Sequence, residues 1–157
     1  PVVHINFNEA ENYCQWNKKR IPTIKEWELA AYTEFRINNK DGYKFKKSYP
    51  YPTGENTLGL NCLNDCNFNY PSKYSKFLLR GYGHVSTSST KKGINGLYDM
   101  GGNVWEWVDI NDNSYKGTKG GSWWYGKNQM IQGYNATKPK NMSAVYIGFR
   151  CVKDFKN

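Results

Sequence analysis

The stretch from Gly96 to Trp107, GLYDMGGNVWEW, limits what this chain can fold into more than any other part of the sequence. Its three glycines make it a poor helix, and its tyrosine and two tryptophans are too large and apolar for a disordered loop. Gly101 and Gly102 allow the backbone to turn tightly where a side chain would clash. The aromatic residues on either side of this turn can serve as buried anchors. We therefore expect an irregular, tightly packed turn at the centre of the molecule.

Two acidic residues, Asp99 and Glu106, flank this turn. A chain that folds back on itself would bring both carboxylates to one point, with the carbonyl oxygens of Gly102 and Val104 facing the same way. Oxygen ligands of this kind suit Ca²⁺, a hard cation with flexible coordination geometry. In the alternative, which the spacing alone favours, both acids bind backbone N–H groups or pair with Arg and Lys.

Four motifs of this chain occur in the same order in one known family. They are the segment Pro1 to Ala31, the central GLYDMGGNVWEW, KGGSWW at Lys119–Trp124 and IGFRC at Ile147–Cys151. With them the chain resembles the formylglycine-generating enzyme (sulfatase-modifying factor) family over nearly its whole length. The resemblance implies one domain over residues 1–157, with an α+β, C-type-lectin-like fold and little regular secondary structure.

The resemblance also implies metal sites. A structural Ca²⁺ would be held by the Asp99 side chain, the Gly102 and Val104 carbonyls and Glu106. A second family Ca²⁺ site would begin at Asn61 and Cys62, but its downstream ligands have no clear counterpart here. Family members usually carry a further glycine-rich N-terminal segment, which is not seen ahead of Pro1, so we expect a trimmed domain or an incomplete chain.

Length and charge limit the classes of protein to consider. A chain of 157 residues fits one domain with a sizeable core. The formal net charge of +9 would suit a nucleic-acid partner, but the basic residues are scattered and no nucleic-acid motif accompanies them. We therefore expect a solvated basic surface and no nucleic-acid partner. No apolar run approaches the ~20 residues of a membrane span, and no signal peptide is visible.

Four cysteines are present, Cys14, Cys62, Cys66 and Cys151. An even number is compatible with two disulfides and an oxidising compartment. A zinc site is the competing interpretation, but these cysteines have no nearby histidine to complete the usual four ligands. The family resemblance implies the pair Cys14–Cys151, which leaves Cys62–Cys66 as a local loop. We therefore expect an extracytoplasmic protein, either periplasmic or secreted.

Local patterns predict two helices near the N-terminus. Asn8 with Glu11, and Thr23 with Glu26, have the spacing of a capping box. The first helix is expected to end near Lys18–Lys19. Between residues 38 and 92 neither a helical nor a strand period persists, so irregular structure is expected. Strands are predicted at Val2–Phe7, in the GGSWW segment that ends at Trp124, and at Ala144–Val152.

The family oxidises a substrate cysteine with O₂ at Cu(I), which two thiolates hold. Soft Cu(I) prefers such ligands. The resemblance places these two cysteines after the GGS motif, where this chain has Tyr125 and Met130. The retained serine, Ser122, has no evident base beside it and is a weak candidate nucleophile. We therefore expect no copper and no copper-oxidase activity.

Two functions remain after this comparison. One is a calcium-stabilised binding or accessory module. The alternative is an oxidoreductase of the formylglycine-generating or sulfoxide-synthase type whose metal a partner domain supplies. Within this chain His4 and His84 are the only histidines, too few for the iron site of the sulfoxide synthases.

A binding role would use the segment from Tyr125 to Tyr146. Its Tyr, Asn, Lys, Gln and Met residues suit adaptable contacts, although an ordinary surface loop would have a similar composition. The expected ligand is a protein, peptide or glycan, and the sequence does not fix the oligomeric state. The candidate ligand-binding surface consists of Ser122, Trp124, Tyr125, Met130 and Tyr134.

Overall fold

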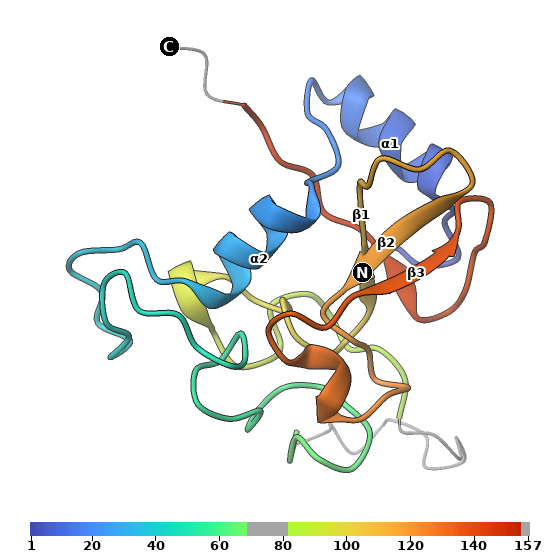
Figure 1. The fold of residues 1–157 in the computed structure, drawn as a ribbon. Coiled ribbons are helices and arrows are strands. Elements are labelled where there is room, and N and C mark those ends of the chain that lie inside the picture. The colour runs from blue at the N-terminus through green and yellow to red at the C-terminus, as the bar shows by residue number, and fades with distance from the viewer. Residues whose placement is uncertain (69–81, 155–157) are drawn as a thin grey trace.

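The computed structural model describes residues 1–68 and 82–154, and Figure 1 shows their fold. Two helices are followed, after a long irregular region, by a small mixed sheet. The helices are α1 (Phe7–Trp16) and α2 (Ile24–Tyr32), and the two 3₁₀ turns are η1 (Ile94–Gly96) and η2 (Lys127–Met130). The strands are β1 (Trp105–Val108), β2 (Tyr115–Lys119), β3 (Ala136–Pro139) and β4 (Ile147–Gly148). The prediction of an α+β fold with little regular secondary structure is confirmed.

The sheet has the strand order β3-β2-β1-β4, so the WEWV segment of the central motif forms an inner strand. β1 pairs antiparallel with β2, placing Glu106 opposite Lys119, and parallel with β4. All four residues of β1 are buried. Because successive side chains of a strand point to opposite faces, both faces of β1 must be covered by other parts of the chain.

The two helices supply these covers. One core contains Trp105 and Trp107, and the other contains Val108. The first core packs residues of α1 against the sheet, and the second packs residues of α2. β1 therefore lies between α1 and α2 (Figure 1). The helices contribute the following buried residues to the two cores: Phe7, Ala10 and Cys14 to the first, and Trp27, Ala31 and Tyr32 to the second.

Both helices begin with a capping box, but the first begins two residues earlier than predicted. The Asn6 side chain accepts the Glu9 N–H at 3.0 Å, and Glu9 accepts the Asn6 N–H at 2.9 Å. The Asn8–Glu11 prediction is therefore wrong, as is the predicted end near Lys18–Lys19, because α1 ends at Trp16. The second box, from Thr23 to Glu26, is confirmed.

The strands are shorter than predicted. Val2–Phe7 is not a strand, because His4 has a φ of 57° and α1 starts at Phe7. β2 ends at Lys119, since Gly120 and Gly121 have φ values of 91° and 69°, and no extended strand continues through that geometry. The terminal strand is limited to β4. In the irregular middle, the described residues 33–68 and 82–93 contain no helix or extended strand, as predicted.

Both disulfides are present. Cys14 is bonded to Cys151, with an S–S distance of 2.02 Å, and Cys62 is bonded to Cys66. These pairings confirm the prediction and are compatible with an extracytoplasmic location. Within residues 1–68 and 82–154, no helix has both the length and the apolar character needed to cross a bilayer.

Candidate functional site

The central turn brings the backbone of two distant segments into direct contact. Residues Asn61 and Gly102 form an isolated bridge, and the Asn103 N–H donates to the Asn61 carbonyl at 2.8 Å. Gly102 has a φ of 70°, and a Cβ there would lie 2.3 Å from the Asn61 oxygen. Only glycine satisfies both conditions, which explains one of the two glycines that the sequence placed in this turn.

Glu106 projects from β1 towards a guanidinium that the C-terminal segment supplies. Arg150 donates from Nε to Oε2 at 2.6 Å and from Nη2 to Oε1 at 2.7 Å. The indole N–H of Trp27, on α2, donates to Oε2 at 2.7 Å. Both oxygens of the carboxylate therefore accept hydrogen bonds, and one ion pair joins three separate parts of the fold.

The environment of Arg150 keeps this pair ionised. Burial lowers the pKa of Arg150, but the charge and hydrogen bonds of Glu106, helped by Asp99, outweigh burial and raise it above its ordinary value. Arg150 stands in the IGFRC motif, so the sequence contained the signal, although sequence reasoning gave the residue no role. A buried acid on an inner strand requires a cation of this kind.

Asp99 binds a neighbouring loop. One carboxylate oxygen accepts the Ser88 N–H at 2.7 Å, and the other accepts the Thr90 hydroxyl at 2.6 Å. Asp99 and Glu106 thus make the contacts that the spacing alone favoured, one binding N–H and O–H groups and the other pairing with Arg. The Arg150 Nη2 also donates to the Tyr98 carbonyl at 3.1 Å, which holds the start of the turn against the same guanidinium.

The residue types at this turn fit Ca²⁺, because carboxylate and carbonyl oxygens are its usual ligands. The Asp99 side chain and the carbonyls of Gly102 and Val104 would be the ligands that hold it. At Glu106 the Arg150 guanidinium competes with a metal ion for the same oxygens. In the described chain, no three His, Cys, Asp or Glu side chains are grouped so as to hold a metal. The calcium site stays a prediction.

Two buried asparagines, Asn61 and Asn103, pack against the turn at the place of the predicted second metal site. The Asn61 Nδ2 donates to the Gly83 carbonyl at 3.0 Å and to the Asn103 Oδ1 at 3.3 Å. Asn103 in turn exchanges hydrogen bonds with the backbone of Val85. Cys62, the other residue proposed for this site, is in a disulfide. These amides hold residues 83–85 against the turn, and a metal at Asn61 and Cys62 stays a prediction.

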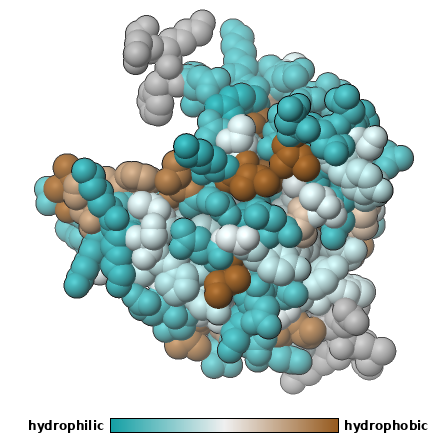
Figure 2. Space-filling model, in the orientation of Figure 1, coloured by the Kyte–Doolittle hydropathy of each residue, from teal (hydrophilic) through white to brown (hydrophobic). Residues whose placement is uncertain are grey.

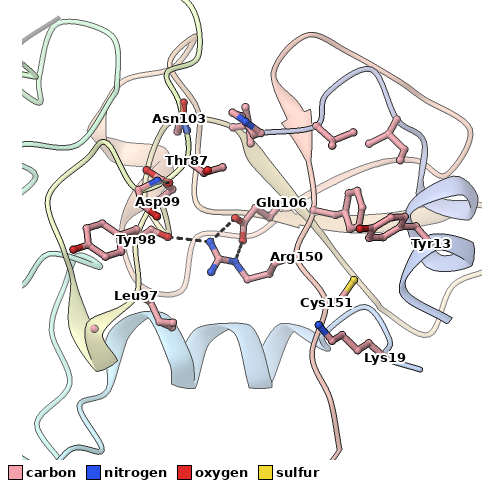
Figure 3. Close-up of a pocket in the computed structure, with 17 residues that line it drawn as sticks. Tyr13, Lys19, Thr87, Leu97, Tyr98, Asp99, Asn103, Glu106, Arg150 and Cys151 are labelled. Carbon is pink, nitrogen blue, oxygen red and sulfur yellow. Dashed lines mark hydrogen bonds and ion pairs between the residues drawn. The ribbon is translucent and has the colours of Figure 1, made fainter. Parts of the chain in front are cut away.

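A cleft of about 570 Å³ opens above the Glu106–Arg150 pair (Figure 3). Its floor contains Arg150, Glu106 and Asp99, and one side contains the rings of Tyr13 and Phe149, which are 5.5 Å apart. The guanidinium side chain is 28 % exposed, and none of the described residues accepts a hydrogen bond from its Nη1. The cleft therefore combines aromatic lining residues with an N–H donor that no described residue accepts.

Tyr125 and Met130, the positions at which the family resemblance predicts copper cysteines, lie elsewhere, on the segment after β2. The Tyr125 ring contacts Trp105 at 5.6 Å and Tyr146 at 5.8 Å between centroids. Met130 is fully buried in a core with Leu60 and both members of the Cys62–Cys66 disulfide. The Leu63 N–H donates to the Tyr125 carbonyl, which ties the disulfide loop to this segment. A phenol and a thioether thus occupy these positions and pack into the protein.

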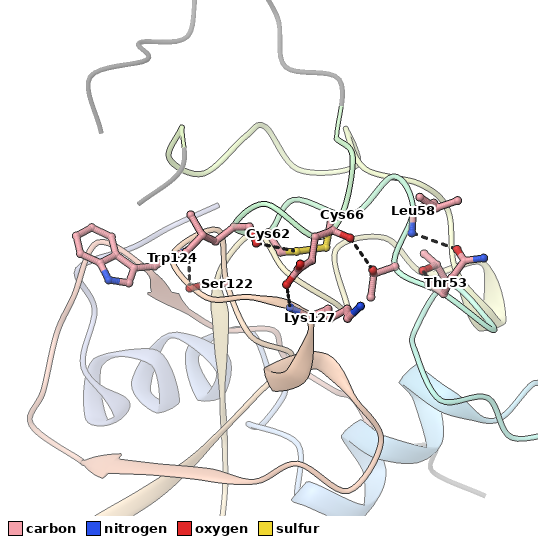
Figure 4. Close-up of a disulfide and its surroundings, with 11 residues drawn as sticks. Thr53, Leu58, Cys62, Cys66, Ser122, Trp124 and Lys127 are labelled. Carbon is pink, nitrogen blue, oxygen red and sulfur yellow. Dashed lines mark hydrogen bonds between the residues drawn. A yellow bond between two sulfur atoms is a disulfide. The ribbon is translucent and has the colours of Figure 1, made fainter. Parts of the chain in front are cut away.

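Two members of the predicted ligand-binding surface are wrong, and the rest of that surface stays a prediction. Ser122 and Met130 are fully buried, so neither can form part of a surface. The Ser122 hydroxyl accepts the Trp124 N–H at 3.3 Å and acts as a turn residue (Figure 4). Trp124 and Tyr125 are partly exposed, and Tyr134 is 37 % exposed. The accessible part of the predicted surface is therefore aromatic.

Sequence reasoning missed a buried lysine beside this surface. Lys119, at the end of β2, donates from Nζ to Glu28 at 2.7 Å and to the Tyr134 carbonyl. Burial lowers the pKa of Lys119, and the Glu28 carboxylate acts against that shift. The side chain joins the loop after η2 to α2, so its role is structural.

Comparisons with known proteins find one matching family and several relatives. The family model described as "Sulfatase-modifying factor enzyme 1-like domain" matches residues 1–155. A relative from Bos taurus, "Inactive C-alpha-formylglycine-generating enzyme 2", is 36 % identical over 128 residues, which covers 78 % of this chain and 38 % of the relative. The "Formylglycine-generating enzyme" of Streptomyces coelicolor is 33 % identical over 110 residues, covering 68 % and 31 % of the two chains.

The fold is also seen in solved structures. "Crystal Structure of CarF" matches with a TM-score of 0.69 and 20 % identity, covering 99 % of this chain and 68 % of that one. At this identity the likeness shows the fold alone. The chain spans about a third of the length of the two relatives above, so their activities concern longer proteins.

Proposed function

Because the chain belongs to the family of sulfatase-modifying factor enzyme 1-like domains, we propose that it is a member without copper-oxidase activity that works as a binding or accessory module. The observation that carries the proposal is the pair Tyr125 and Met130 at the positions of the two copper cysteines. Neither side chain is a thiolate, and both are packed against other residues. Soft Cu(I) in such a site depends on thiolate ligands.

The remaining cysteines cannot take over this role as they stand. All four are in disulfides, and no free cysteine is present. The metal that we retain in the proposal is Ca²⁺ at the central turn, as a structural ion. The two disulfides also support our proposal of a periplasmic or secreted protein, in which such bonds persist.

The aromatic residues after Ser122 are the proposed ligand surface. Trp124 contacts Trp123 at 4.9 Å and Tyr146 at 5.7 Å between ring centroids, so several rings form one group. Large rigid rings give contact area at a low cost in conformational entropy, which suits a protein, peptide or glycan ligand. The names of the relatives do not separate the alternatives, because one is called inactive and the other an enzyme.

An activity assay tests the loss of chemistry. The oxidised protein is incubated with Cu(I), O₂ and a sulfatase-type CxPxR peptide, and the peptide mass is followed, with an active formylglycine-generating enzyme as positive control. We expect the peptide cysteine to remain unchanged. Conversion of that cysteine to an aldehyde would overturn the proposal. Conversion only after a metal-bearing partner is added would favour the partner-dependent oxidoreductase instead.

Binding is tested separately, with peptide and glycan arrays. We expect a ligand whose retention falls at least tenfold in Trp124→Ala, while the same change at the distant exposed Trp16 leaves it unchanged. Equal loss in both variants, or retention unaffected by Trp124→Ala, would remove the surface from the proposal.

A further inference from the structure

The segment of residues 33–48, which we call the basic loop, extends away from the body of the protein after α2. In Figure 1 it lies at the left, on the side of α2 away from α1. Its two arms are joined at the base: Thr33 pairs with Ser48, and Glu34 exchanges backbone hydrogen bonds with Lys46 and Lys47. The loop is thus closed at its base, and the Phe35 N–H, which donates to the Asn95 Oδ1 at 2.7 Å, holds this base against the body.

Three large apolar side chains of the basic loop face solvent. Ile37 is 74 % exposed, Phe35 is 51 % exposed and Phe45 is 44 % exposed. The pairing of Glu34 with Lys46 and Lys47 places Phe35 and Phe45 on facing arms. Figure 2 shows apolar and hydrophilic side chains close together on the projection at the left of the view. Single exposed apolar residues are ordinary, but a group on one loop indicates a contact surface.

This exposure belongs to an ordered loop. The Asn39 side chain donates to the Tyr43 carbonyl at 2.7 Å and accepts the Tyr43 N–H at 3.2 Å, which fixes the tip. The Tyr43 and Tyr49 rings meet edge to face at 5.5 Å, and the Tyr49 hydroxyl accepts the Lys44 N–H. The loop thus has a packed inner side, formed by Tyr43 and Tyr49. Its exposed apolar residues are not part of that packing.

The charged residues of the basic loop also differ between its inner and outer sides. Its acids are paired: Glu34 is fully buried and bonded to Arg36 at 2.8 Å, and Asp41 contacts both Arg36 and Lys92. The outer lysines have no such partner, because no described carboxylate lies within ion-pair distance of them. The outer surface of the loop is consequently apolar and positively charged. Its unpaired lysines are Lys40, Lys44 and Lys46.

We propose that the basic loop docks the protein on the surface of a lipid bilayer that contains anionic lipids. The exposed apolar side chains of the loop would enter the headgroup region, while the neighbouring lysines meet lipid phosphates. Peripheral binding of this kind needs two contributions, an apolar one and an electrostatic one, and the loop supplies both. Long lysine side chains can keep their charge at the interface while their methylene groups lie against apolar surface.

A bilayer fits the loop better than an acidic protein does. A specific protein interface buries roughly 800 Å² on each partner, usually with a complementary groove or flat patch. The basic loop offers only three large exposed apolar side chains, all within residues 33–48. Insertion into a fluid surface does not require a complementary shape on the partner, so these side chains can enter it.

Vesicle co-sedimentation tests the proposal with the whole chain and its disulfides intact. The probes are vesicles of phosphatidylcholine with one fifth phosphatidylglycerol, and vesicles of phosphatidylcholine alone. We expect at least tenfold tighter binding to the anionic vesicles, weakening as NaCl rises from about 0.05 to 0.5 M because exposed charges are screened.

Two triple variants separate the contributions. Phe35→Ser with Ile37→Ser and Phe45→Ser, and Lys40→Gln with Lys44→Gln and Lys46→Gln, should each lower binding about tenfold. The matched control is Lys18→Gln with Lys25→Gln and Lys153→Gln, which makes the same change in net charge at exposed sites outside the loop. It should change binding less than about threefold. Near-UV circular dichroism checks that each variant keeps its fold.

A fluorophore shows whether the basic loop enters the bilayer. The environment-sensitive dye NBD on Ile37→Cys should brighten with anionic vesicles, and the same dye on Lys153→Cys should not. Equal loss of binding in the loop and control lysine variants would reduce the effect to net charge and overturn the proposal. Binding to poly-glutamate without binding to vesicles would overturn it in favour of an acidic macromolecule.

Discussion

The central turn and the segment after Ser122 both carry motifs of the same family, yet their side chains are used differently. In the turn, the motif residues keep specific partners, as Glu106 does with Arg150 and Gly102 does with Asn61. After Ser122, Tyr125 and Met130, at the positions where the resemblance predicts copper cysteines, pack against other side chains. The difference teaches that the turn motif is needed to build the fold, so its presence says nothing about catalysis.

The largest expected effect concerns the glycine at the centre of the turn. Gly102→Ala combines a left-handed backbone, which costs about 1–2 kcal/mol for other residues, with a Cβ that overlaps the Asn61 carbonyl. We expect the free energy of unfolding in urea to fall by more than about 4 kcal/mol, the range of the most damaging single substitutions. Gly133→Ala is the matched control, because Gly133 also has a positive φ, 84°, but no atom within 4 Å of the added Cβ. Equal losses of unfolding free energy in the two variants would show that the close contact with Asn61 does not make Gly102 harder to replace than Gly133.

Next in size is removal of the cation that Glu106 requires. Arg150→Met should lower the free energy of unfolding by about 3 kcal/mol, the lower end for a broken buried pair, because the guanidinium is partly exposed. Adding Glu106→Leu to Arg150→Met should restore part of that stability, since no charge is then left unpaired. If the double variant is less stable than Arg150→Met alone, the ion pair is not what Arg150 contributes.

A change at Met130 tests the second region, the segment after Ser122. Met130→Ala should cost about 2–4 kcal/mol in urea unfolding, as expected for a fully buried side chain, and Met130→Leu less than about 1.5 kcal/mol. This pair of results would establish that Met130 contributes to stability as a core residue. A cost below about 1 kcal/mol for Met130→Ala would mean that the site is still open.

Calcium removal should have a smaller effect. Because Arg150 already neutralises Glu106, an ion at the turn adds only the free energy of mass action, about 1 kcal/mol at modest excess over Kd. We expect EGTA to lower Tm by about 2–4 °C in a chain of this size, and Asp99→Asn to remove that sensitivity. An unchanged melt, with no calcium in elemental analysis, would leave the ion pair and hydrogen bonds as the whole account.

Lowering the pH should have the smallest effect on stability. We expect it to act at Glu34, in the contact between α2 and the start of the turn. Hydrogen bonds from Arg36 hold the pKa of Glu34 below its usual 4.5, so this acid is charged in the folded state at pH values where the unfolded chain binds a proton. Its contribution to stability is therefore complete above about pH 5 and is lost as pH falls through the folded-state pKa. Glu34→Gln should flatten the Tm profile below pH 5, with Glu55→Gln, on an exposed pair, as control. Identical profiles would exclude the contribution.

Much of the fold could be predicted from the sequence, because the residues concerned either interact with close neighbours in the chain or belong to a recognised motif. The Thr23 cap, both disulfides and the irregular structure of residues 38–68 and 82–92 were predicted correctly, and residues 69–81 lie outside the described part of the chain. The first cap was misplaced because Asn6 with Glu9 and Asn8 with Glu11 have the same spacing. Burial decides between them, since a helix that begins at Phe7 puts Phe7, Ala10 and Cys14 on one face.

The site was predicted less well, because its contacts join distant parts of the chain. Glu106 and Arg150 are 44 residues apart, and Trp27 is 79 residues from Glu106. Local spacing showed two acids beside a turn but not the cation that reaches them. The end of β2 was missed for another reason: two consecutive glycines in the left-handed region leave the strand geometry that a GGSWW pattern suggests.

The Cys14–Cys151 bond has a mechanical consequence. It joins residues 137 positions apart, so a force applied to the two ends of the chain enters at Cys14, crosses one covalent bond and leaves at Cys151. The helix α2 and the whole sheet lie between these residues and carry none of the tension while the bond is intact. Only the first turns of α1 and the terminal segments can lengthen under load. In series with other domains, the protein would act as a short inextensible link, and reduction of this one bond would release most of its contour length.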